Sequence, residues 1–196
     1  MSNGGGGGSQ KAQNITSNTK KLPPGGGGSP TGCGPKCDHE WDCKPIPKKP
    51  GTPLQDMIGQ VAKGKNAGAA FESRAASHNA ADIKSGDDIS PDFKCKKCGD
   101  TKEVDHVTRD ANGNITKVVQ AKADLSTAAG GTSAKGVTIK PKQLYEDKKV
   151  IQSINDCQKN SGVKAQLQYK LQSGTAALEA EKFLIKNSVP LITMVP

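Results

Sequence analysis

The dipeptide Asn112-Gly113 separates two runs of residues with high β-propensity, 103–111 and 114–122. Asn-Gly between two such runs is the strongest short-range signal for a β-hairpin, because both central residues of a type I′ turn need a positive φ angle. The sequence therefore predicts an antiparallel hairpin over residues 103–122, with a two-residue loop.

Four polar side chains share one face of this predicted hairpin. A two-residue loop places Asp105 opposite Gln120 and Glu103 opposite Lys122. Because side chains alternate along a strand, these four lie on the same face, whereas His106 points to the other, where it packs or meets solvent. A loop one residue longer would send one strand's set to the opposite face.

Such a face suits a divalent cation beside a phosphate group. A hard cation needs oxygen ligands, which Asp105, Gln120 and Glu103 carry. The ammonium of Lys122 can orient or deprotonate the attacking water and neutralise charge that develops on the scissile phosphate. The alternative is a solvated hairpin with one Glu103–Lys122 surface ion pair, worth ~0.2–1 kcal/mol.

Four further elements are predicted after the hairpin. Apolar residues recur at helical spacing over 143–160 and 175–186, and they alternate with polar residues over 163–171. The segment 189–195 is a short apolar strand. A hairpin followed by helix, strand, helix and strand predicts an α/β (α+β) fold, in which helices pack on a mixed sheet.

A helix is also predicted before the hairpin, over residues 54–81. Three glycines weaken it, each by ~1 kcal/mol relative to alanine, and its best part is 66–81. Glu72 in that part is a further candidate metal ligand if the helix lies beside the hairpin. The alternative is a helical glutamate in water.

The order of these elements and residues resembles the PD-(D/E)xK superfamily of restriction-endonuclease-like nucleases. The resemblance covers roughly residues 54–195 and rests on a helix with Glu72, a hairpin with Asp105 and the run Gln120-x-Lys122. In that family an acidic residue on the second core strand binds the metal, and the (D/E)xK strand supplies a ligand and the lysine. The resemblance therefore implies these roles for Asp105, Gln120 and Lys122.

Two features depart from the family pattern. Gln120 replaces an acidic residue, which lowers the negative charge available to hold a cation. Val104 rather than proline precedes Asp105, and the pair Pro91-Asp92 lies earlier, in a predicted loop.

More narrowly, the compact hairpin and the glycine-rich leader resemble restriction-endonuclease-fold toxins at the C-terminal ends of bacterial polymorphic and type VI secretion effectors. That resemblance implies an antibacterial effector that acts in the target-cell cytoplasm, and a cognate immunity protein. We expect a Mg²⁺- or Mn²⁺-dependent endonuclease acting on DNA. An RNase of the same fold, and a non-catalytic, zinc-stapled module that binds nucleic acid or a partner, are the alternatives.

The charge of the chain agrees with a polyanionic partner. There are 28 Lys and Arg against 19 Asp and Glu, for a net charge of +9. Because aromatic residues make up only 3% of the chain, duplex backbone binding is favoured over stacking on single strands. Candidate phosphate contacts are Lys135, Lys140 and Lys142, the first in a predicted flexible loop over 124–136. A solvated basic face is the alternative.

The first fifty residues differ in composition from the rest. Glycine, proline, serine and asparagine dominate residues 1–30, which are predicted to be disordered. We therefore expect a flexible leader over residues 1–50 and the nuclease domain over 51–196. No signal peptide or membrane span is predicted, so we expect no membrane association and export by a route without a cleavable signal peptide.

Six cysteines raise the question of a second metal. Cys95-x2-Cys98, followed by glycine, has the spacing of a zinc knuckle. The leader offers further donors in Cys33, Cys37, His39 and Cys43. In one reading, Cys33 or Cys37 together with Cys43 or His39, with Cys37 and Cys43 as the first choice, completes a structural zinc site that is not itself catalytic. The alternative is disulfides or thiols, with Cys157 buried in a helix.

Overall fold

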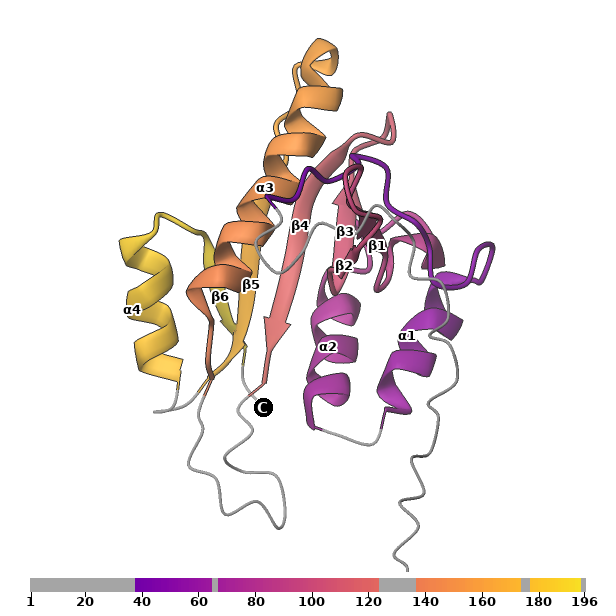
Figure 1. Ribbon diagram of the computed structural model, residues 1–196. Helices are drawn as coiled ribbons and strands as arrows, with labels where there is room; N and C mark the ends of the chain where they lie inside the picture. Colours follow the sequence, from indigo (N-terminus) through magenta and orange to yellow (C-terminus); the bar gives the residue numbers. More distant parts are fainter. Residues whose placement is uncertain (1–37, 65–66, 124–136, 174–176, 195–196) are drawn as a thin grey trace, which may run out of the picture. The chain divides into compact units, whose positions relative to one another are not determined.

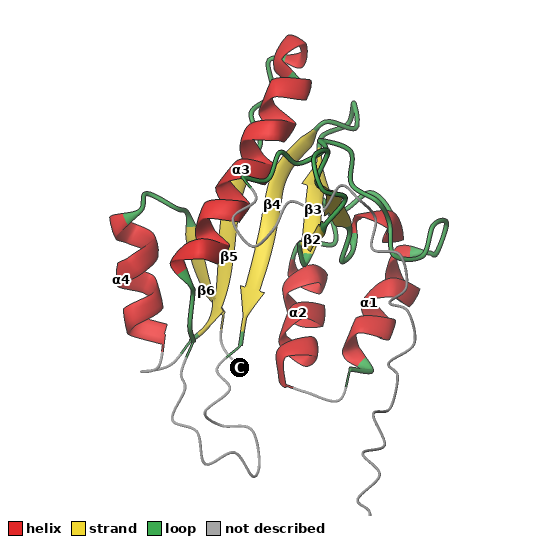
Figure 2. Ribbon diagram, viewed as in Figure 1, coloured by secondary structure: helices red, strands yellow, loops and turns green. Residues whose placement is uncertain are grey.

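The computed structural model describes residues 38–64, 67–123, 137–173 and 177–194, which belong to the compact unit Thr31–Pro196. In these residues the chain has a mixed α+β fold of four α-helices and two sheets (Figures 1 and 2). In chain order the elements are α1 (Leu54–Ala62), α2 (Ala67–His78), the 3-10 turn η1 (Gly86–Asp88), β1 (Asp92–Lys94), β2 (Thr101–Glu103), β3 (His106–Arg109), β4 (Ile115–Lys122), α3 (Pro141–Cys157), the 3-10 turn η3 (Lys159–Ser161), β5 (Gln166–Gln172), α4 (Leu178–Lys186) and β6 (Leu191–Met194).

The larger sheet is mixed, as the sequence predicted. Its strand order is β3-β4-β5-β6, with β3 antiparallel to β4 and the other two pairs parallel. Parallel neighbours need crossover connections, and α3 and α4 lie in those two connections. Strands β1 and β2 form a separate antiparallel pair. The mixed α+β architecture is thus confirmed, whereas the specific restriction-endonuclease-like fold stays a prediction.

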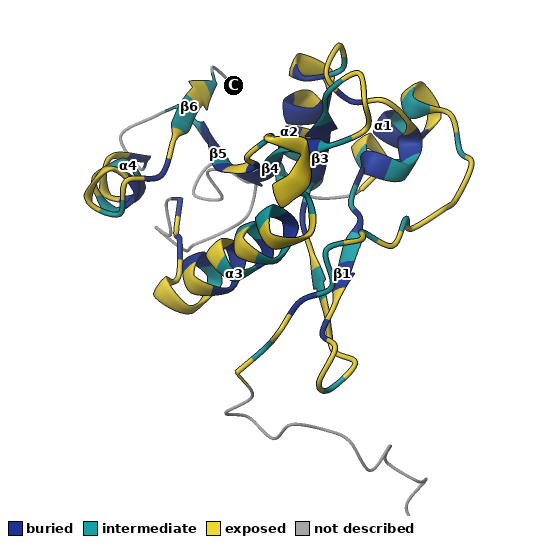
Figure 3. Ribbon diagram, turned by 90° about the horizontal axis from the view of Figure 1, so that it is seen from above, coloured by how far each residue is buried: buried dark blue, intermediate teal, exposed yellow. Residues whose placement is uncertain are grey.

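Helices pack on both faces of the larger sheet, with α3 on one side and α2 on the other (Figure 3). On the α3 side, Val118 of β4 packs against Val150. On the α2 side, Ala121 of β4 packs against Phe71 and Ala75. Because the side chains of β4 alternate between two covered faces, this strand is buried or half-buried along its whole length.

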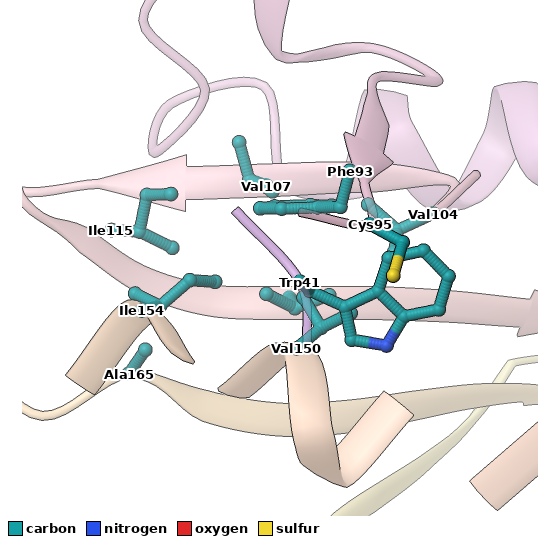
Figure 4. Packing of buried hydrophobic residues seen from close by; sticks show 10 residues of the cluster. Trp41, Phe93, Cys95, Val104, Val107, Ile115, Val150, Ile154 and Ala165 are labelled. Atoms are coloured by element: carbon teal, nitrogen blue, oxygen red, sulfur yellow. The ribbon is translucent and has the colours of Figure 1, made fainter. Parts of the chain in front are cut away.

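The segment 38–53 runs as a loop before α1 (Figure 2) but is part of the folded core. Trp41 is 2% exposed and packs with Phe93 and Cys95 (Figure 4). Ile46 pairs with β1 through an isolated β-bridge. The predicted domain boundary at residue 50 therefore falls inside the folded unit, because burial of the one tryptophan draws this segment onto β1.

The predicted helix over 54–81 is two helices. Helix α1 ends at Ala62 and α2 begins at Ala67. A Cβ atom at Gly64 would lie 2.3 Å from the Cβ of Ala69, so the turn between the helices depends on glycine. Of the three helix-weakening glycines, Gly64 marks a real break, whereas Gly59 lies inside α1 and Gly68 inside α2.

The C-terminal elements follow the predicted order, with boundaries shifted by a few residues. One predicted face is wrong. Lys170 of β5, expected on the polar side, is fully buried. Its ammonium donates hydrogen bonds to the Ala75 carbonyl at 2.9 Å and to Nδ1 of His78 at 3.1 Å, because α2 covers that face. No helix in the described ranges is long and apolar enough to cross a bilayer.

Candidate functional site

The hairpin forms with a three-residue loop, so the predicted two-residue loop is wrong. The backbone N–H of Asp110 donates to the Asn114 carbonyl at 3.0 Å, which leaves residues 111–113 as the loop, with Gly113 at φ +83°. The Asp110 carboxylate accepts hydrogen bonds from the backbone N–H groups of Asn112 at 2.9 Å and Asn114 at 2.8 Å. This side-chain cap favours the longer loop.

A β-bulge restores the predicted register. Thr108 pairs with Lys117, but the next residue, Arg109, pairs with Ile115, so Thr116 is an extra residue in β4. The extra residue in the loop and the extra residue in the strand cancel. The ladder on the far side of the bulge therefore has the register that the two-residue loop predicted.

The first strand of the hairpin is interrupted. Strand β2 ends at Glu103 and pairs with β1, and Asp105 lies in a bend before β3 begins. Glu103 is opposite Asp92, which the sequence had placed in a loop. The carboxylate of Glu103 lies 2.9 Å from Nζ of Lys48. Both the predicted pairing of Glu103 with Lys122 across the ladder and the simple solvated hairpin are thus wrong.

Glu72 of α2, Asp105 and Lys122 nevertheless lie within electrostatic reach of one another. Burial raises the pKa of Asp105 to about 7, against the opposing charge of Lys122, and the carboxylates of Glu72 and Glu103 raise it further. Burial also raises the pKa of Glu72, again opposed by Lys122 and assisted by Glu103. We call Glu72, Glu103, Asp105 and Lys122 the hairpin cluster.

Helix α2 brings Glu72 to this cluster because the neighbouring Phe71 packs on Ala121 of β4. Asp105 is held there by a hydrogen bond of 2.5 Å that its carboxylate accepts from the Ala121 backbone N–H. The conditional prediction that Glu72 lies near the hairpin therefore holds for its position. Its role as a metal ligand stays a prediction.

Gln120 takes part in a second, buried group of polar side chains. Its Nε2 donates to the Asp147 carboxylate of α3 at 3.2 Å. The same carboxylate accepts a hydrogen bond from the Tyr169 hydroxyl at 2.5 Å and lies 2.6 Å from Nζ of Lys102. We call these four residues the Asp147 network. Since Asp147 uses the amide nitrogen of Gln120, the amide oxygen is left as the acceptor end of that side chain.

The sequence prediction missed Asp147 and Lys102. Asp147 lies three residues after Leu144 and three before Val150, on the apolar side of the predicted helix. A charged residue on that side signals a buried carboxylate that needs partners. No comparable signal marks Lys102, which reaches Asp147 from a short strand on the other side of the core.

His106 lies away from the hairpin cluster, as alternation predicted. It is fully buried, with Nε2 2.9 Å from Nδ2 of Asn79. Burial, and to a smaller extent the charges of Lys170 and Lys117, lower its pKa to about 3. His106 is therefore a neutral, packed residue.

The structure describes two of the three lysines that the sequence suggested as phosphate contacts. Lys140 and Lys142 are exposed at the beginning of α3, whereas Lys135 and the segment 124–136 lie outside the described residues. The N-terminal ends of α2 and α3 lie at the same end of the larger sheet as the carboxyl end of β4 (Figure 1). That end carries two helix N-termini and the side chains of Lys122, Lys140 and Lys142, together with the carboxylates of the hairpin cluster.

The cysteine predictions need correction. Cys43 forms a disulfide with Cys157, so Cys43 is not a zinc ligand. Cys157 is not a buried thiol but an exposed residue at the end of α3. Cys37 lies outside the described residues. Cys95 and Cys98 are thiols in the turn between β1 and β2.

Cys95 has an unusual environment for a cysteine. Burial opposes ionisation of its thiol, but hydrogen bonds from the backbone N–H groups of Cys98, Lys97 and Glu40 and from the Cys98 side chain outweigh it and lower the pKa to about 7.

Within the described residues, one group of three histidine, cysteine or acidic side chains converges closely enough to hold a metal ion. The group is His39, Cys98 and Asp100, whose ligand atoms all lie within 4.8 Å of one another. The carboxylates of the hairpin cluster do not converge to that degree.

No family model matches the chain, and neither the curated proteins nor the solved structures include a significant match to it.

Proposed function

We propose that this chain is a metal-dependent nuclease that hydrolyses phosphodiester bonds, with Glu72, Asp105 and Lys122 at its active site. The supporting observation is that two carboxylates with raised pKa values lie within electrostatic reach of one lysine at the carboxyl end of β4. A carboxyl group whose pKa is raised as far as that of Asp105 is typical of functional sites.

The hairpin cluster supplies the carboxylate oxygens that a divalent cation prefers, and its carboxylates would have to move closer together to share one ion. Burial and mutual repulsion disfavour the charged forms of Asp105 and Glu72, and a cation between them offsets both effects. The amide oxygen of Gln120 is a neutral donor of the kind that such a site accepts. When bound, Mg²⁺ or Mn²⁺ polarises the phosphate and makes a bound water more acidic.

The chain's own side chains do the remaining work. Lys122 neutralises negative charge that develops on the scissile phosphate. Asp105 would hold the cation, whose charge would keep its carboxylate ionised, and the Lys122 ammonium can orient the attacking water. Lys140 and Lys142, exposed at the beginning of α3, contact phosphates of the backbone and hold the substrate against this end of the sheet.

We take DNA as the substrate, with RNA as the alternative. A net charge of +9 and an aromatic content of 3% favour binding to a duplex backbone over stacking on single strands. By the likeness of its hairpin and leader to bacterial effector toxins, we extend the proposal to an antibacterial effector with a cognate immunity protein.

The test is cleavage of supercoiled plasmid by the purified full chain with Mg²⁺ or Mn²⁺, and with EDTA. We expect metal-dependent nicking that falls at least about 100-fold in Asp105→Ala and Lys122→Met. Lys117→Met, on the same strand, is the matched control and should cut at the wild-type rate. A structured RNA incubated in parallel tells DNase from RNase.

A second candidate function, a non-catalytic module that binds nucleic acid, rests on the same positive charge. Absence of cutting with either metal, together with equal DNA affinity of the wild type and both variants, would reject the nuclease and support this module.

A further inference from the structure

We propose a second metal site, separate from the hairpin cluster, in which His39, Cys95, Cys98 and Asp100 hold a structural Zn²⁺ ion. The site joins the segment before α1 to the turn between β1 and β2. It rests on different residues from the proposed nuclease site and stands whether or not the chain cuts nucleic acid.

The donor atoms already lie close together. The ligand atoms of His39, Cys98 and Asp100 are within 4.8 Å of one another, and the Cys95 thiol exchanges a hydrogen bond with that of Cys98. Bonds of ~2.0–2.3 Å to zinc put tetrahedral ligands roughly 3.3–3.8 Å apart. Cys95 is outside the convergent group of three and is linked to it through Cys98, so its sulfur would have to move toward His39 and Asp100 to complete the set.

The turn that carries the cysteines has the form of a metal-binding knuckle. The Gly99 N–H donates to the Cys95 carbonyl at 2.9 Å, and the Cys95 N–H donates to the Asp100 carbonyl at 2.7 Å. Gly99 has φ +79°, which closes the turn. The backbone N–H groups of Lys97 and Cys98 point at the Cys95 sulfur. N–H groups placed in this way stabilise a thiolate, the form that binds metal.

His39 is oriented for the same purpose. Its Nδ1 lies 3.3 Å from Oε2 of Glu146, which also accepts a hydrogen bond of 3.1 Å from Nε1 of Trp41. With its proton on Nδ1, the neutral imidazole presents the Nε2 lone pair, and Nε2 lies 3.5 Å from Oδ2 of Asp100. A separation of this size lets both atoms bind one zinc ion. A histidine backed by a buried carboxylate is the usual support of a zinc ligand.

The donor chemistry favours zinc over a hard cation. Two thiolates and an imidazole are soft or borderline ligands, and sets of sulfur and nitrogen donors select Zn²⁺ over Mg²⁺ or Ca²⁺. The nearby disulfide uses Cys43 and Cys157, so it does not compete for Cys95 or Cys98.

Such an ion would anchor segments that the rest of the molecule depends on. The Trp41–Cys95 β-bridge and the hydrogen bond of 2.8 Å from the Lys96 N–H to the Glu40 carbonyl already tie the two segments together. Zinc would add a bond that chelators remove. Because β2 leads from the knuckle to Asp105, the ion also steadies the approach to the hairpin cluster.

The full-length protein, purified without metal-chelating steps, provides the test. Elemental analysis should find about one zinc per chain. Replacement by Co²⁺ should give the intense visible bands of a tetrahedral ion and a thiolate-to-cobalt charge-transfer band. Affinity for Zn²⁺ should fall at least about 10-fold in His39→Asn and in Cys98→Ser.

Two further variants separate the site from its surroundings. The double variant Cys43→Ser, Cys157→Ser removes two sulfurs near the site and should keep zinc at wild-type affinity. Glu146→Gln keeps an acceptor for Trp41 Nε1 and removes the negative charge beside His39, so it should weaken zinc binding less than His39→Asn does.

Three results would overturn the proposal. The first is a folded wild-type chain that binds neither Zn²⁺ nor Co²⁺. The second is wild-type zinc affinity in both single variants. The third is a Cys95–Cys98 disulfide in peptide mapping of the freshly purified chain. If the single variants do not fold, removal of zinc from the wild-type chain by a chelator and its reloading with Co²⁺ decide the question alone.

Discussion

Two aspartates close to Gln120, Asp147 and Asp105, differ in how many partners compensate the charge of their carboxylates. Asp147 is fully buried, and its carboxylate contacts the side chains of Lys102, Gln120 and Tyr169. Three partners, one of them an ammonium, compensate the cost of burying that charge. Asp147 is therefore a structural residue that ties α3 to the sheet.

Asp105 has much less compensation. Its carboxylate accepts a hydrogen bond from the Ala121 N–H, and its pKa is about 7 because burial and the nearby Glu72 and Glu103 outweigh Lys122. A partly buried carboxylate is repelled by neighbouring carboxylates when few partners compensate its charge, and a bound cation would offset that repulsion. Both carboxylates are buried to a large extent, so the number and charge of their partners, more than burial itself, separate the well-compensated Asp147 from the poorly compensated Asp105.

The largest effect on stability is expected when the well-paired aspartate, Asp147, is removed. Asp147→Ala should lower the free energy of unfolding by ~3–5 kcal/mol, because it leaves Lys102 in a nearly buried position without its partner. Urea unfolding followed by circular dichroism measures the change. Asp156→Ala, at an exposed position of the same helix, is the control and should stay within ~0.5 kcal/mol. A loss below ~1 kcal/mol for Asp147→Ala would contradict the structural role.

The opposite result is expected at Asp105. Its folded pKa of about 7 lies above the ordinary value of 3.8, so its contribution to stability is fully present below about pH 4 and is lost as the pH rises to about 7. Asp105→Asn should therefore be more stable than the wild type at pH 8, by about 2 kcal/mol for a partly buried group, and similar to it at pH 4. Urea unfolding at both pH values tests this. Parallel pH profiles of variant and wild type would show that Asp105 is not strained.

A third measurement tests whether Gln120 belongs to the Asp147 network. Gln120→Glu puts a second carboxylate against Asp147 and should destabilise the fold by about 2 kcal/mol. The loss should be smaller by about 1 kcal/mol or more in an Asp147→Asn background, where the repulsion is gone. A double-mutant cycle of unfolding free energies measures this coupling. Additive effects would mean that Gln120 and Asp147 do not interact.

The smallest effect is expected at Glu103. Its side chain is 50% exposed and paired with Lys48, so Glu103→Gln should change stability by less than ~0.5 kcal/mol. It should, however, lower the pKa of Asp105, because it removes one neighbouring negative charge. Carbon-13 NMR titration of the Asp105 carboxyl detects the change. An unchanged titration would exclude Glu103 from the hairpin cluster.

Local patterns predicted much of the fold, and in one case two departures cancelled. The helix α3, the strand β5 and the elements after them follow from the spacing of apolar residues. The hairpin register was predicted from a two-residue loop, yet the true loop is longer, and the bulge at Thr116 compensates for it. A bulge of this kind has no clear signal in the sequence, because it depends on how the strand packs.

The sequence by itself determined α3, β5, α4 and β6 and the register of β3 with β4, because these depend on residues that are close together in the chain. Only the tertiary structure decided which side chains from distant parts of the chain contact one another. Asp147 contacts Gln120 across 27 positions, and Glu146 contacts His39 across 107. A charge that is buried when the chain folds needs a partner, and that partner can come from any distance along the chain. A pattern of neighbouring residues therefore does not predict it.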